Sequence, residues 1–245
     1  MKSEHKKYLL MFDFDKTILN DDSFGFLFMK ALTKEEKEEI YRLPRNQNWV
    51  IGFNYTLKKI KSHGTTLNEF NKILEELPLT KGMLDLFSYI EKQKSKFEVV
   101  LMSGDYEYVI KYLLKYHKIY DLFSDIICTP SRISNSEEED QFIYVLEKKP
   151  HNCKICNPCN CKSQDFKEFC LSHDINQYEN VIFICDGWND FCLAKILSNR
   201  DIVFARKNFA LYKKLFENNL KSEINCKVEG WEDGKDIIKY LQSLK

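Results

Sequence analysis

The chain has 245 residues, enough to bury a substantial core in one domain with at most a small insertion. Its 37 lysine and arginine residues balance 37 aspartate and glutamate residues, so net charge favours neither nucleic acid nor a membrane surface as partner. No apolar run approaches the roughly 20 residues of a transmembrane helix, and the acidic N-terminal stretch does not fit a signal peptide. These features predict a cytoplasmic protein.

Short apolar runs rich in Val, Ile and Phe alternate along the chain with longer amphipathic stretches. This alternation is typical of an α/β fold, a Rossmann-like and mostly parallel sheet with helices on both faces. The predicted strands are 8–14, 97–102, 125–128, 181–185, 201–204 and 226–229. The predicted helices are 83–94, 106–116, 164–173, 190–197, 209–219 and 235–244.

Residues 22–80 interrupt this alternation because they contain no convincing strand. Thr33 with Glu36, and Thr66 with Glu69, each fit the capping box that opens a helix. We therefore expect a small helical cap at 22–80, inserted after the first strand. The α/β core would comprise residues 1–21 and 81–245.

The first predicted strand ends in two carboxylates, Asp13 and Asp15, where desolvation of charge is costly. Either both are solvated turn residues, or a cation binds against them. Alternation along the strand turns both side chains to the same side, with Phe14 pointing away.

Two later strands also end in polar residues, at 103–105 and 186–190. In an open parallel sheet, the carboxyl ends of the strands gather along the edge where ligands bind. We therefore expect convergence of Asp13, Asp15, Ser103, Asp186 and Asp190.

These convergent residue types indicate a phosphoryl-transfer site. Carboxylates without a nearby histidine suit Mg²⁺ better than zinc, and Mg²⁺ typically bridges to a phosphate. A serine hydroxyl and a backbone N–H, at Ser103 and Gly104, can hold phosphate oxygens. One short acidic motif is a weak signal, whereas three at separate strand ends are far more specific.

The segment 151–162, HNCKICNPCNCK, contains one histidine and four cysteines. Zinc takes four such ligands in a tetrahedron, and Cys-x2-Cys is a good chelating half, so a structural Zn²⁺ site is one interpretation. Reduced cysteines in a surface loop are the other. With no secretion signal, both are favoured over a disulfide framework.

The strand-end motifs resemble those of the haloacid dehalogenase (HAD) superfamily of phosphohydrolases. Asp13 and Asp15 match its first motif, Ser103 its second and Asp186-Gly187-x-Asn189-Asp190 its fourth. The cysteine-rich segment, an "LP-T-GM" stretch at 77–83 and "DGWNDFC" resemble the PHOSPHO-type branch more closely, over nearly the whole chain. Members of that branch hydrolyse phosphoethanolamine, phosphocholine or pyridoxal phosphate, and plant relatives act on thiamine monophosphate.

The resemblance implies an Mg²⁺-dependent phosphomonoesterase that works through an aspartyl-phosphate on the nucleophile Asp13. Asp15 would be the general acid and base. Asp13, Asp186 and the backbone carbonyl of Asp15 would hold the metal, and Asp190 would support that site.

The resemblance also implies how the phosphate is held. Ser103, the N–H of Gly104 and Lys162, matched to the third-motif lysine, would contact the phosphoryl oxygens. In the cysteine segment the branch pattern favours His151, Cys153, Cys156 and Cys161 as four zinc ligands. Cys159 is an alternative ligand. Zinc there would be structural and would fix Lys162 toward the phosphate.

The sequence departs from the branch in its pocket. Gly104, followed by Asp105, stands where amine-phosphate-specific members have Asp, and Phe24 stands at the place of another Asp. Trp188 replaces a small residue. A more apolar pocket would suit a ring, so the expected substrate is a small metabolite phosphate such as pyridoxal 5'-phosphate or thiamine monophosphate. Phosphoethanolamine or phosphocholine is the alternative.

Two other functions remain open from sequence. One is a zinc-loop binding protein on an inactive scaffold, against which the balanced charge and the intact Asp13 and Asp15 argue. The other is a phosphotransferase that passes the phosphoryl group to an acceptor other than water.

Overall fold

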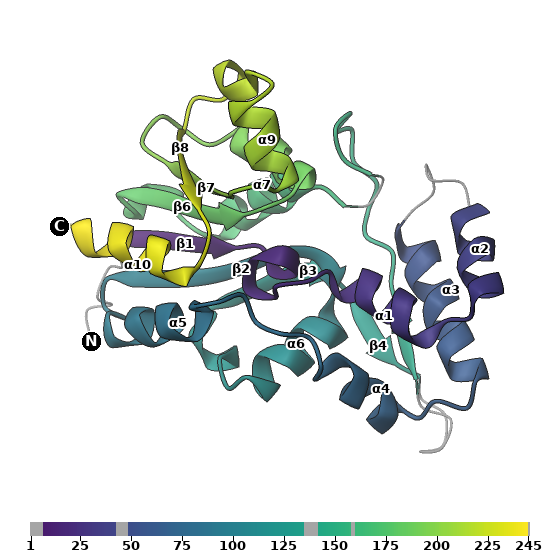
Figure 1. Cartoon of the computed structure of the whole chain (residues 1–245). Coiled ribbons are helices and arrows are strands. Elements are labelled where there is room, and N and C mark those ends of the chain that lie inside the picture. The colour runs from purple at the N-terminus through teal and green to yellow at the C-terminus, as the bar shows by residue number, and fades with distance from the viewer. Residues whose placement is uncertain (1–6, 43–48, 135–141, 158–159, 245) are drawn as a thin grey trace.

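The computed structural model describes residues 7–42, 49–134, 142–157 and 160–244 (Figure 1). Within these ranges, six parallel strands form the central sheet in the order β3-β2-β1-β6-β7-β8. They are β1 (Tyr8–Phe12), β2 (Phe97–Tyr106), β3 (Asp125–Thr129), β6 (Asn180–Cys185), β7 (Ile202–Arg206) and β8 (Lys227–Trp231). The predicted α/β class and its six strands are confirmed.

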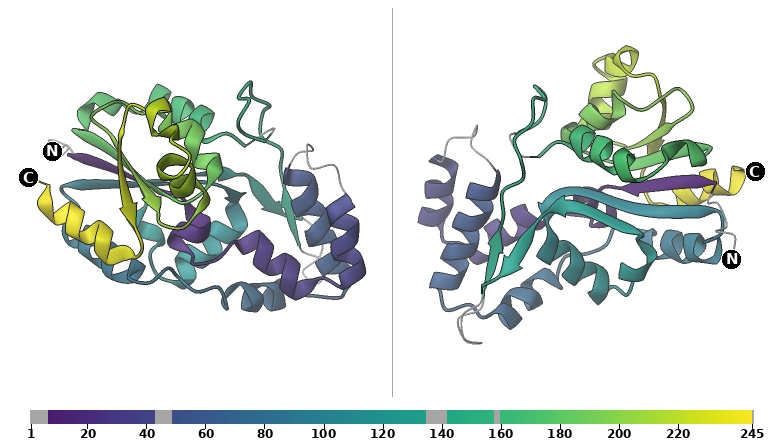
Figure 2. Two further views of the ribbon diagram at one scale, coloured as in Figure 1. Left: turned by 45° about the horizontal axis from the view of Figure 1, so that its top comes forward. Right: turned by 180° about the vertical axis from the view of Figure 1, so that it is seen from behind.

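Helices cover both faces of this sheet (Figures 1 and 2). Alternation along β1 sends Tyr8, Leu10 and Phe12 into the core on one face, and Leu9 and Met11 into the core on the other. The first face packs against α5 (Met83–Lys92), α6 (Glu107–Tyr116) and α10 (Gly234–Ser243). The second packs against α7 (Lys162–Ser172), α8 (Phe191–Ala194) and α9 (Ala210–Phe216). Burial on both faces explains why the strands read as continuous apolar runs.

The strand order reverses at β1, which pairs with β2 on one side and with β6 on the other. In open α/β sheets, ligands bind outside the carboxyl ends of the strands at such a point. Asp13 directly follows β1 and Asp186 directly follows β6. The topology therefore brings these two carboxylates to the ligand-binding edge.

Among the described residues between β1 and α5, four α-helices follow the turn after β1: α1 (Ser23–Ala31), α2 (Lys34–Arg42), α3 (Trp49–Ser62) and α4 (Leu67–Leu74). The first three lie beyond the carboxyl end of β1, and α4 packs beside α6 (Figure 1). Both predicted capping boxes are present. The Thr33 and Thr66 hydroxyls accept the N–H groups of Glu36 and Glu69 at 3.3 and 3.2 Å. Each glutamate carboxylate in turn accepts the threonine N–H.

A short antiparallel pair, β4 (Ser131–Ile133) and β5 (Ile143–Val145), was not predicted. Three-residue strands are too short for an alternation pattern to be recognised. The pair packs on α3, where the Asn54 side chain donates to the Val145 carbonyl and accepts its N–H, both at 2.8 Å. We propose that the cap comprises the predicted residues 22–80 together with β4 and β5.

β1 ends at Phe12, so the predicted strand 8–14 is two residues too long. The Asp13 carboxylate accepts the N–H of Phe14 at 2.7 Å and starts a tight helical turn, Phe14–Ile18, in which Lys16 has a φ of 54°. The strand-alternation argument for Asp15 was therefore wrong, because Asp15 lies in this turn.

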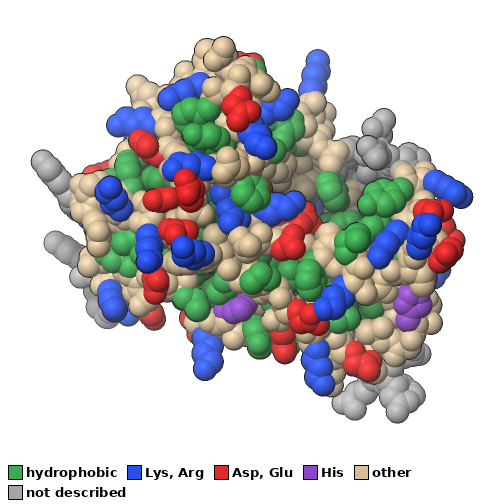
Figure 3. Space-filling view, viewed as in Figure 1, with side chains coloured by type: hydrophobic (Ala, Val, Ile, Leu, Met, Phe, Trp, Pro, Cys, Tyr) green, Lys and Arg blue, Asp and Glu red, His purple; other side chains and the backbone are tan. Residues whose placement is uncertain are grey.

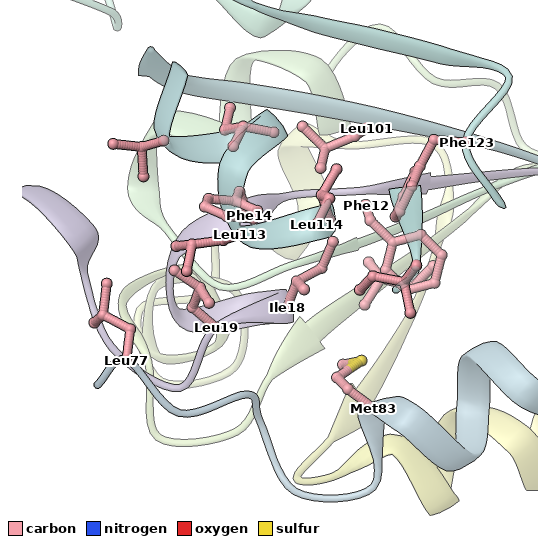
Figure 4. Packing of buried hydrophobic residues seen from close by; sticks show 14 of the residues in the cluster. Phe12, Phe14, Ile18, Leu19, Leu77, Met83, Leu101, Leu113, Leu114 and Phe123 are labelled. Atoms are coloured by element: carbon pink, nitrogen blue, oxygen red, sulfur yellow. The ribbon is translucent and has the colours of Figure 1, made fainter. Parts of the chain in front are cut away.

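Apolar side chains anchor the turn from inside the core. Phe14, Ile18 and Leu19 are fully buried, and Figure 4 shows them in one cluster with Leu113 and Leu114 of α6. The residues that carry the carboxylates are thus attached to the same core that the first face of the sheet buries.

Arg206, at the end of β7, holds the turn from the other side. Its buried guanidinium donates to the carbonyl of Lys16 at 2.5 Å and to the side-chain oxygen of Asn20 at 2.6 Å. It also lies over the Trp231 ring, 5.2 Å from the ring centroid. The fork of the guanidinium suits two acceptors that diverge in this way.

The surface charge is mixed. On the face in Figure 3, basic and acidic side chains are interspersed rather than gathered by sign, in agreement with the balanced composition. In the part of the chain that the structure describes, no helix combines the length and apolarity needed to cross a membrane.

Arg206→Leu is expected to destabilise the fold, because the carbonyl of Lys16 would lose a buried donor. The free energy of unfolding should fall by about 1–3 kcal/mol. Urea denaturation measures the change. Arg206→Lys should show a smaller loss, and Arg200→Leu, at an exposed position, should stay within about 0.5 kcal/mol of the unsubstituted chain. Equal midpoints for Arg206→Leu and Arg200→Leu would contradict the assigned role.

Candidate active site

A pocket of about 310 Å³ opens where β1, β2 and β6 end. Its lining includes five of the predicted site residues: Asp13, Asp15, Ser103, Gly104 and Asp186. The other two predicted catalytic-site residues, Lys162 and Asp190, are buried and linked to Asp13. Residues from four separate segments thus converge on one site.

Lys162 is the central cation of the site. It is the first residue of α7, its side chain is 1% exposed, and its Nζ lies 2.7 Å from Asp13 Oδ1. The same Nζ forms an ion pair with Asp190. Burial alone would lower the pKa of Lys162, but the two carboxylates hold that pKa above its usual range. The ammonium charge is therefore retained in the interior.

Asp13, Asp186 and Asp190 form a group of carboxylates in which one oxygen from each lies within 4.8 Å of the other two. Burial raises the pKa of Asp13 to about 7, although Lys162 opposes this shift. Burial, and then the repulsion from Asp13 and Asp190, raises the pKa of Asp186 to about 8. A cation among these oxygens would remove that repulsion, and hard oxygen donors suit Mg²⁺.

Asp190 organises the turn after β6. Its Oδ2 accepts the N–H groups of Gly187 at 2.8 Å and Asp186 at 3.3 Å, while its Oδ1 contacts Lys162. A Cβ on Gly187 would lie 2.2 Å from Asn189 Oδ1, so the Asn189 side chain packs closely over this glycine. Asp190 therefore orients both a carboxylate and the lysine of the site.

The end of β2 brings Ser103 and Asp105 into the same pocket, because its pairing with β3 is irregular there. Ser103 Oγ accepts the N–H of Asp105 at 3.1 Å, and the Asp105 carboxylate accepts the Ser23 hydroxyl at 2.6 Å. A Cβ on Gly104 would lie 2.2 Å from Asn160 Nδ2, so Asn160 covers this glycine closely. Sequence reasoning did not single out Ser23 or Asn160.

Asp15 lies in the turn after β1, half-buried, and its Oδ1 accepts the N–H of Ser23 at 2.9 Å. Burial raises its pKa well above the usual range, and the neighbouring Asp105 and Asp22 raise it further. Burial also raises the pKa of Asp105 to about 7. A carboxyl group that keeps its proton near neutral pH is suited to donate it.

Four aromatic side chains also line the pocket. Phe24, Trp49 and Phe53 line it from the helices after β1, with ring centroids of Phe24 and Phe53 4.9 Å apart. Trp188, stacked on Phe191, lines it from the turn after β6.

The expectation of a more apolar pocket needs correction. Gly104 and Phe24 stand at the two positions where amine-phosphate-specific members of the branch have Asp. Asp105 and Asp22, close to them in the sequence, nevertheless line the pocket. The chain therefore retains carboxylates near the site, because the irregular end of β2 turns Asp105 into it.

The cysteine-rich segment lies beside this site. Cys153, Cys156 and Cys161 gather with Cys192 of α8, and the four Sγ atoms lie within 4.8 Å of one another. The Cys156 thiol donates to the Cys192 sulfur at 3.2 Å, and this hydrogen bond lowers the pKa of Cys192 to about 6. Cys192 was not among the ligands expected from the sequence.

His151 does not join this group of thiols. Its Nε2 donates to the carbonyl of Asn157 at 2.8 Å, and its Nδ1 accepts the N–H of Cys153 at 3.2 Å. Cys192 instead completes a set of four possible ligands, while the alternative ligand Cys159 lies outside the described residues. The only sequence signal for Cys192 was its place beside the DGWND motif.

Residues 8–245 match the family model described as "Putative Phosphatase". The chain is 30% identical over 242 residues to pyridoxal phosphate phosphatase PHOSPHO2 of Homo sapiens, covering 97% of this chain and 98% of that protein. It is 28% identical over 246 residues to the phosphoethanolamine/phosphocholine phosphatase of Gallus gallus, covering 99% and 90%. A HAD family hydrolase from Salmonella enterica serovar Typhi has the same fold, with a TM-score of 0.66 at 14% identity. The match covers 98% of this chain and 72% of that chain.

Lys162→Met is expected to destabilise the fold, because Asp13 and Asp190 would remain buried without their cation. Breaking a buried pair in this way costs about 3–5 kcal/mol. Urea denaturation at neutral pH measures the loss. Lys167→Met, at an exposed position of the same helix, is the matched control and should change little. Similar stability of the two variants would argue against the buried ion pair.

Proposed function

Because the chain belongs to the Putative Phosphatase family, in the PHOSPHO-type branch of the HAD phosphatases, we propose that it hydrolyses small phosphomonoesters with Mg²⁺. Membership of this family makes the chain a phosphatase of the HAD type rather than a binding protein. The observation that carries the finer proposal is the carboxylate group of Asp13, Asp186 and Asp190 around the buried Lys162.

Asp13 is the proposed nucleophile. Its carboxylate attacks the phosphorus of the ester, the bond from phosphorus to the leaving oxygen breaks, and an aspartyl-phosphate forms. The described contacts from Lys162 and Phe14 both reach Oδ1 of Asp13, which favours Oδ2 as the attacking oxygen. Asp13, Asp186 and the backbone carbonyl of Asp15 would hold Mg²⁺, which supplies charge neutralisation at the phosphate.

Asp15 is the proposed general acid and base. It gives its proton to the leaving oxygen and then takes one from the water that attacks the aspartyl-phosphate. This second step releases inorganic phosphate and restores Asp13. The raised pKa of Asp15, caused by burial and then by Asp105 and Asp22, supports the first role. The N–H of Ser23, 2.9 Å from Oδ1, supports its orientation.

Ser103, Gly104 and Lys162 are proposed to bind the phosphoryl oxygens. Ser103 Oγ accepts the N–H of Asp105, and its hydroxyl can donate its own proton to a phosphate oxygen. Lys162 is charged and buried. A positive charge that is shielded from water strongly stabilises the negative charge that develops in the transition state. Asp190 supports this group by holding Lys162.

The aromatic wall favours an ester with a ring. Phe24, Trp49, Phe53 and Trp188 line the pocket beside the carboxylates. Such a wall matches the ring of pyridoxal 5'-phosphate or thiamine monophosphate, and one of these is the proposed substrate.

A second candidate is phosphoethanolamine or phosphocholine. Asp105 and Asp22 in the pocket favour it, since a carboxylate beside aromatic rings suits an ammonium group. Both candidates share the reaction at Asp13 and differ only in the leaving group.

Asp13→Asn should abolish hydrolysis, because an amide cannot form the aspartyl-phosphate. Inorganic phosphate release is measured on pyridoxal phosphate, thiamine monophosphate, phosphoethanolamine, phosphocholine and p-nitrophenyl phosphate, with Mg²⁺ or with chelator. Turnover that needs Mg²⁺ and is lost in Asp13→Asn is expected. Turnover that survives in Asp13→Asn would refute the nucleophile, and turnover that needs an added acceptor would indicate a phosphotransferase.

Trp49→Ala and Asp105→Asn should separate the two substrate candidates. Loss of an aromatic contact is expected to lower kcat/KM for the ring esters by about 5- to 10-fold, with little effect on phosphoethanolamine. Loss of the Asp105 charge should affect the ammonium esters more. If Trp49→Ala changes all esters equally, the aromatic wall does not select the ring.

A further inference from the structure

The proposed phosphatase reaction does not use the four clustered thiols. Cys153, Cys156 and Cys161 belong to the segment before α7, and Cys192 belongs to α8. We propose that these four cysteines bind one Zn²⁺ as thiolates and that this site fastens the start of α7 to the turn after β6.

The sulfur positions fit a tetrahedral metal site. With Zn–S bonds of about 2.3 Å, the sulfurs of a tetrahedron lie about 3.8 Å apart. Cys192 Sγ lies 3.2 Å from Cys156 Sγ and 3.9 Å from Cys161 Sγ, and all four sulfurs lie within 4.8 Å of one another. Neither contact approaches the roughly 2.05 Å of a disulfide bond.

The donor chemistry separates this site from the carboxylate group. Thiolates select zinc over magnesium, whereas carboxylate oxygens suit magnesium. The thiol cluster has four cysteines, and the group around Asp13 has only oxygen donors. The two neighbouring sites therefore favour different metals.

Four protein ligands leave no open coordination position, which is typical of a structural zinc site rather than a catalytic one. Cys161 and Cys192 are buried, and Cys153 and Cys156 are half-buried. The described residues of the stretch 146–161 lie in no helix or strand. A metal would supply the rigidity that secondary structure does not provide here.

The thiol cluster lies close in sequence to two residues of the candidate active site. Cys161 directly precedes Lys162, and Cys192 follows Asp190 by two residues. Lys162 and Asp190 form the buried ion pair behind Asp13. A metal bound to Cys161 and Cys192 would therefore fix the backbone next to both members of that pair. The four cysteines would be positioning residues.

The ligand set is tested first by metal analysis of the intact protein. About one zinc per chain is expected, and X-ray absorption at the zinc edge should show four sulfur ligands. This measurement needs no variant, so a misfolded mutant does not compromise it. A chain without zinc, or a site with three sulfurs and one nitrogen, would overturn the assignment.

Substitutions then identify the ligands. Cys192→Ser should lose zinc, and its cobalt-loaded form should lose most thiolate-to-cobalt absorption. Zinc and the thiolate-to-cobalt absorption should both be retained in Cys159→Ser and His151→Ala. They should also be retained in the control Cys170→Ser, because Cys170 is a half-buried cysteine of α7 outside the cluster. Zinc retained in Cys192→Ser, or lost in Cys159→Ser, would refute Cys192 as the fourth ligand.

The fastening role is tested by removing and returning the metals separately. Without zinc, trypsin should cleave after the exposed Lys154 faster, and kcat should fall even with saturating Mg²⁺. Zinc should restore both. The kcat measurement rests on the proposed function of Lys162, whereas the cleavage rate and the metal content do not. Failure of the zinc proposal can therefore be distinguished from failure of the proposed function. Equal cleavage with and without zinc would refute the fastening role.

Discussion

The buried charge of Lys162 sets the arrangement of everything around it. An ammonium group in the interior is tolerated only with close partners, here Asp13 and Asp190. These three residues come from the turn after β1, the start of α7 and the turn after β6. The chain must therefore bring three distant segments to one point, and the reversal of strand order at β1 is what makes that possible.

The charges at this point do not balance among themselves. Asp13, Asp186 and Asp190 carry up to three negative charges against the single positive charge of Lys162. The excess equals the charge of one divalent cation, and burial leaves little water to screen it. Burial, and after it the repulsion among these carboxylates, raises the pKa values of Asp13 and Asp186, and the same excess of negative charge favours a metal.

Features that depend on local sequence patterns could be predicted from the sequence, whereas features that depend on contacts between distant segments could not. Burial on both faces of the sheet produced apolar runs from which the six strands could be predicted. The motifs at strand ends predicted that Asp13, Ser103 and Asp186 converge, and all three line one pocket. Arg206 was missed because its acceptors, including the Lys16 carbonyl, lie in a turn far away along the chain. Cys192 was missed for the same reason, since α8 meets the cysteine segment only in the folded protein. The roles of these residues depend on tertiary contacts that no local pattern encodes.

Asn160 covers Gly104 so closely that a Cβ at position 104 would lie 2.2 Å from its side-chain nitrogen. Asn160 stands one residue before Cys161, in the segment that holds the thiol cluster. A side chain at position 104 would require the Asn160 side chain to rotate away, a smaller residue at 160, or a shift of its segment. Positions 104 and 160 are therefore coupled by direct contact, and a substitution at 104 would displace a side chain in the segment that also holds the thiol cluster.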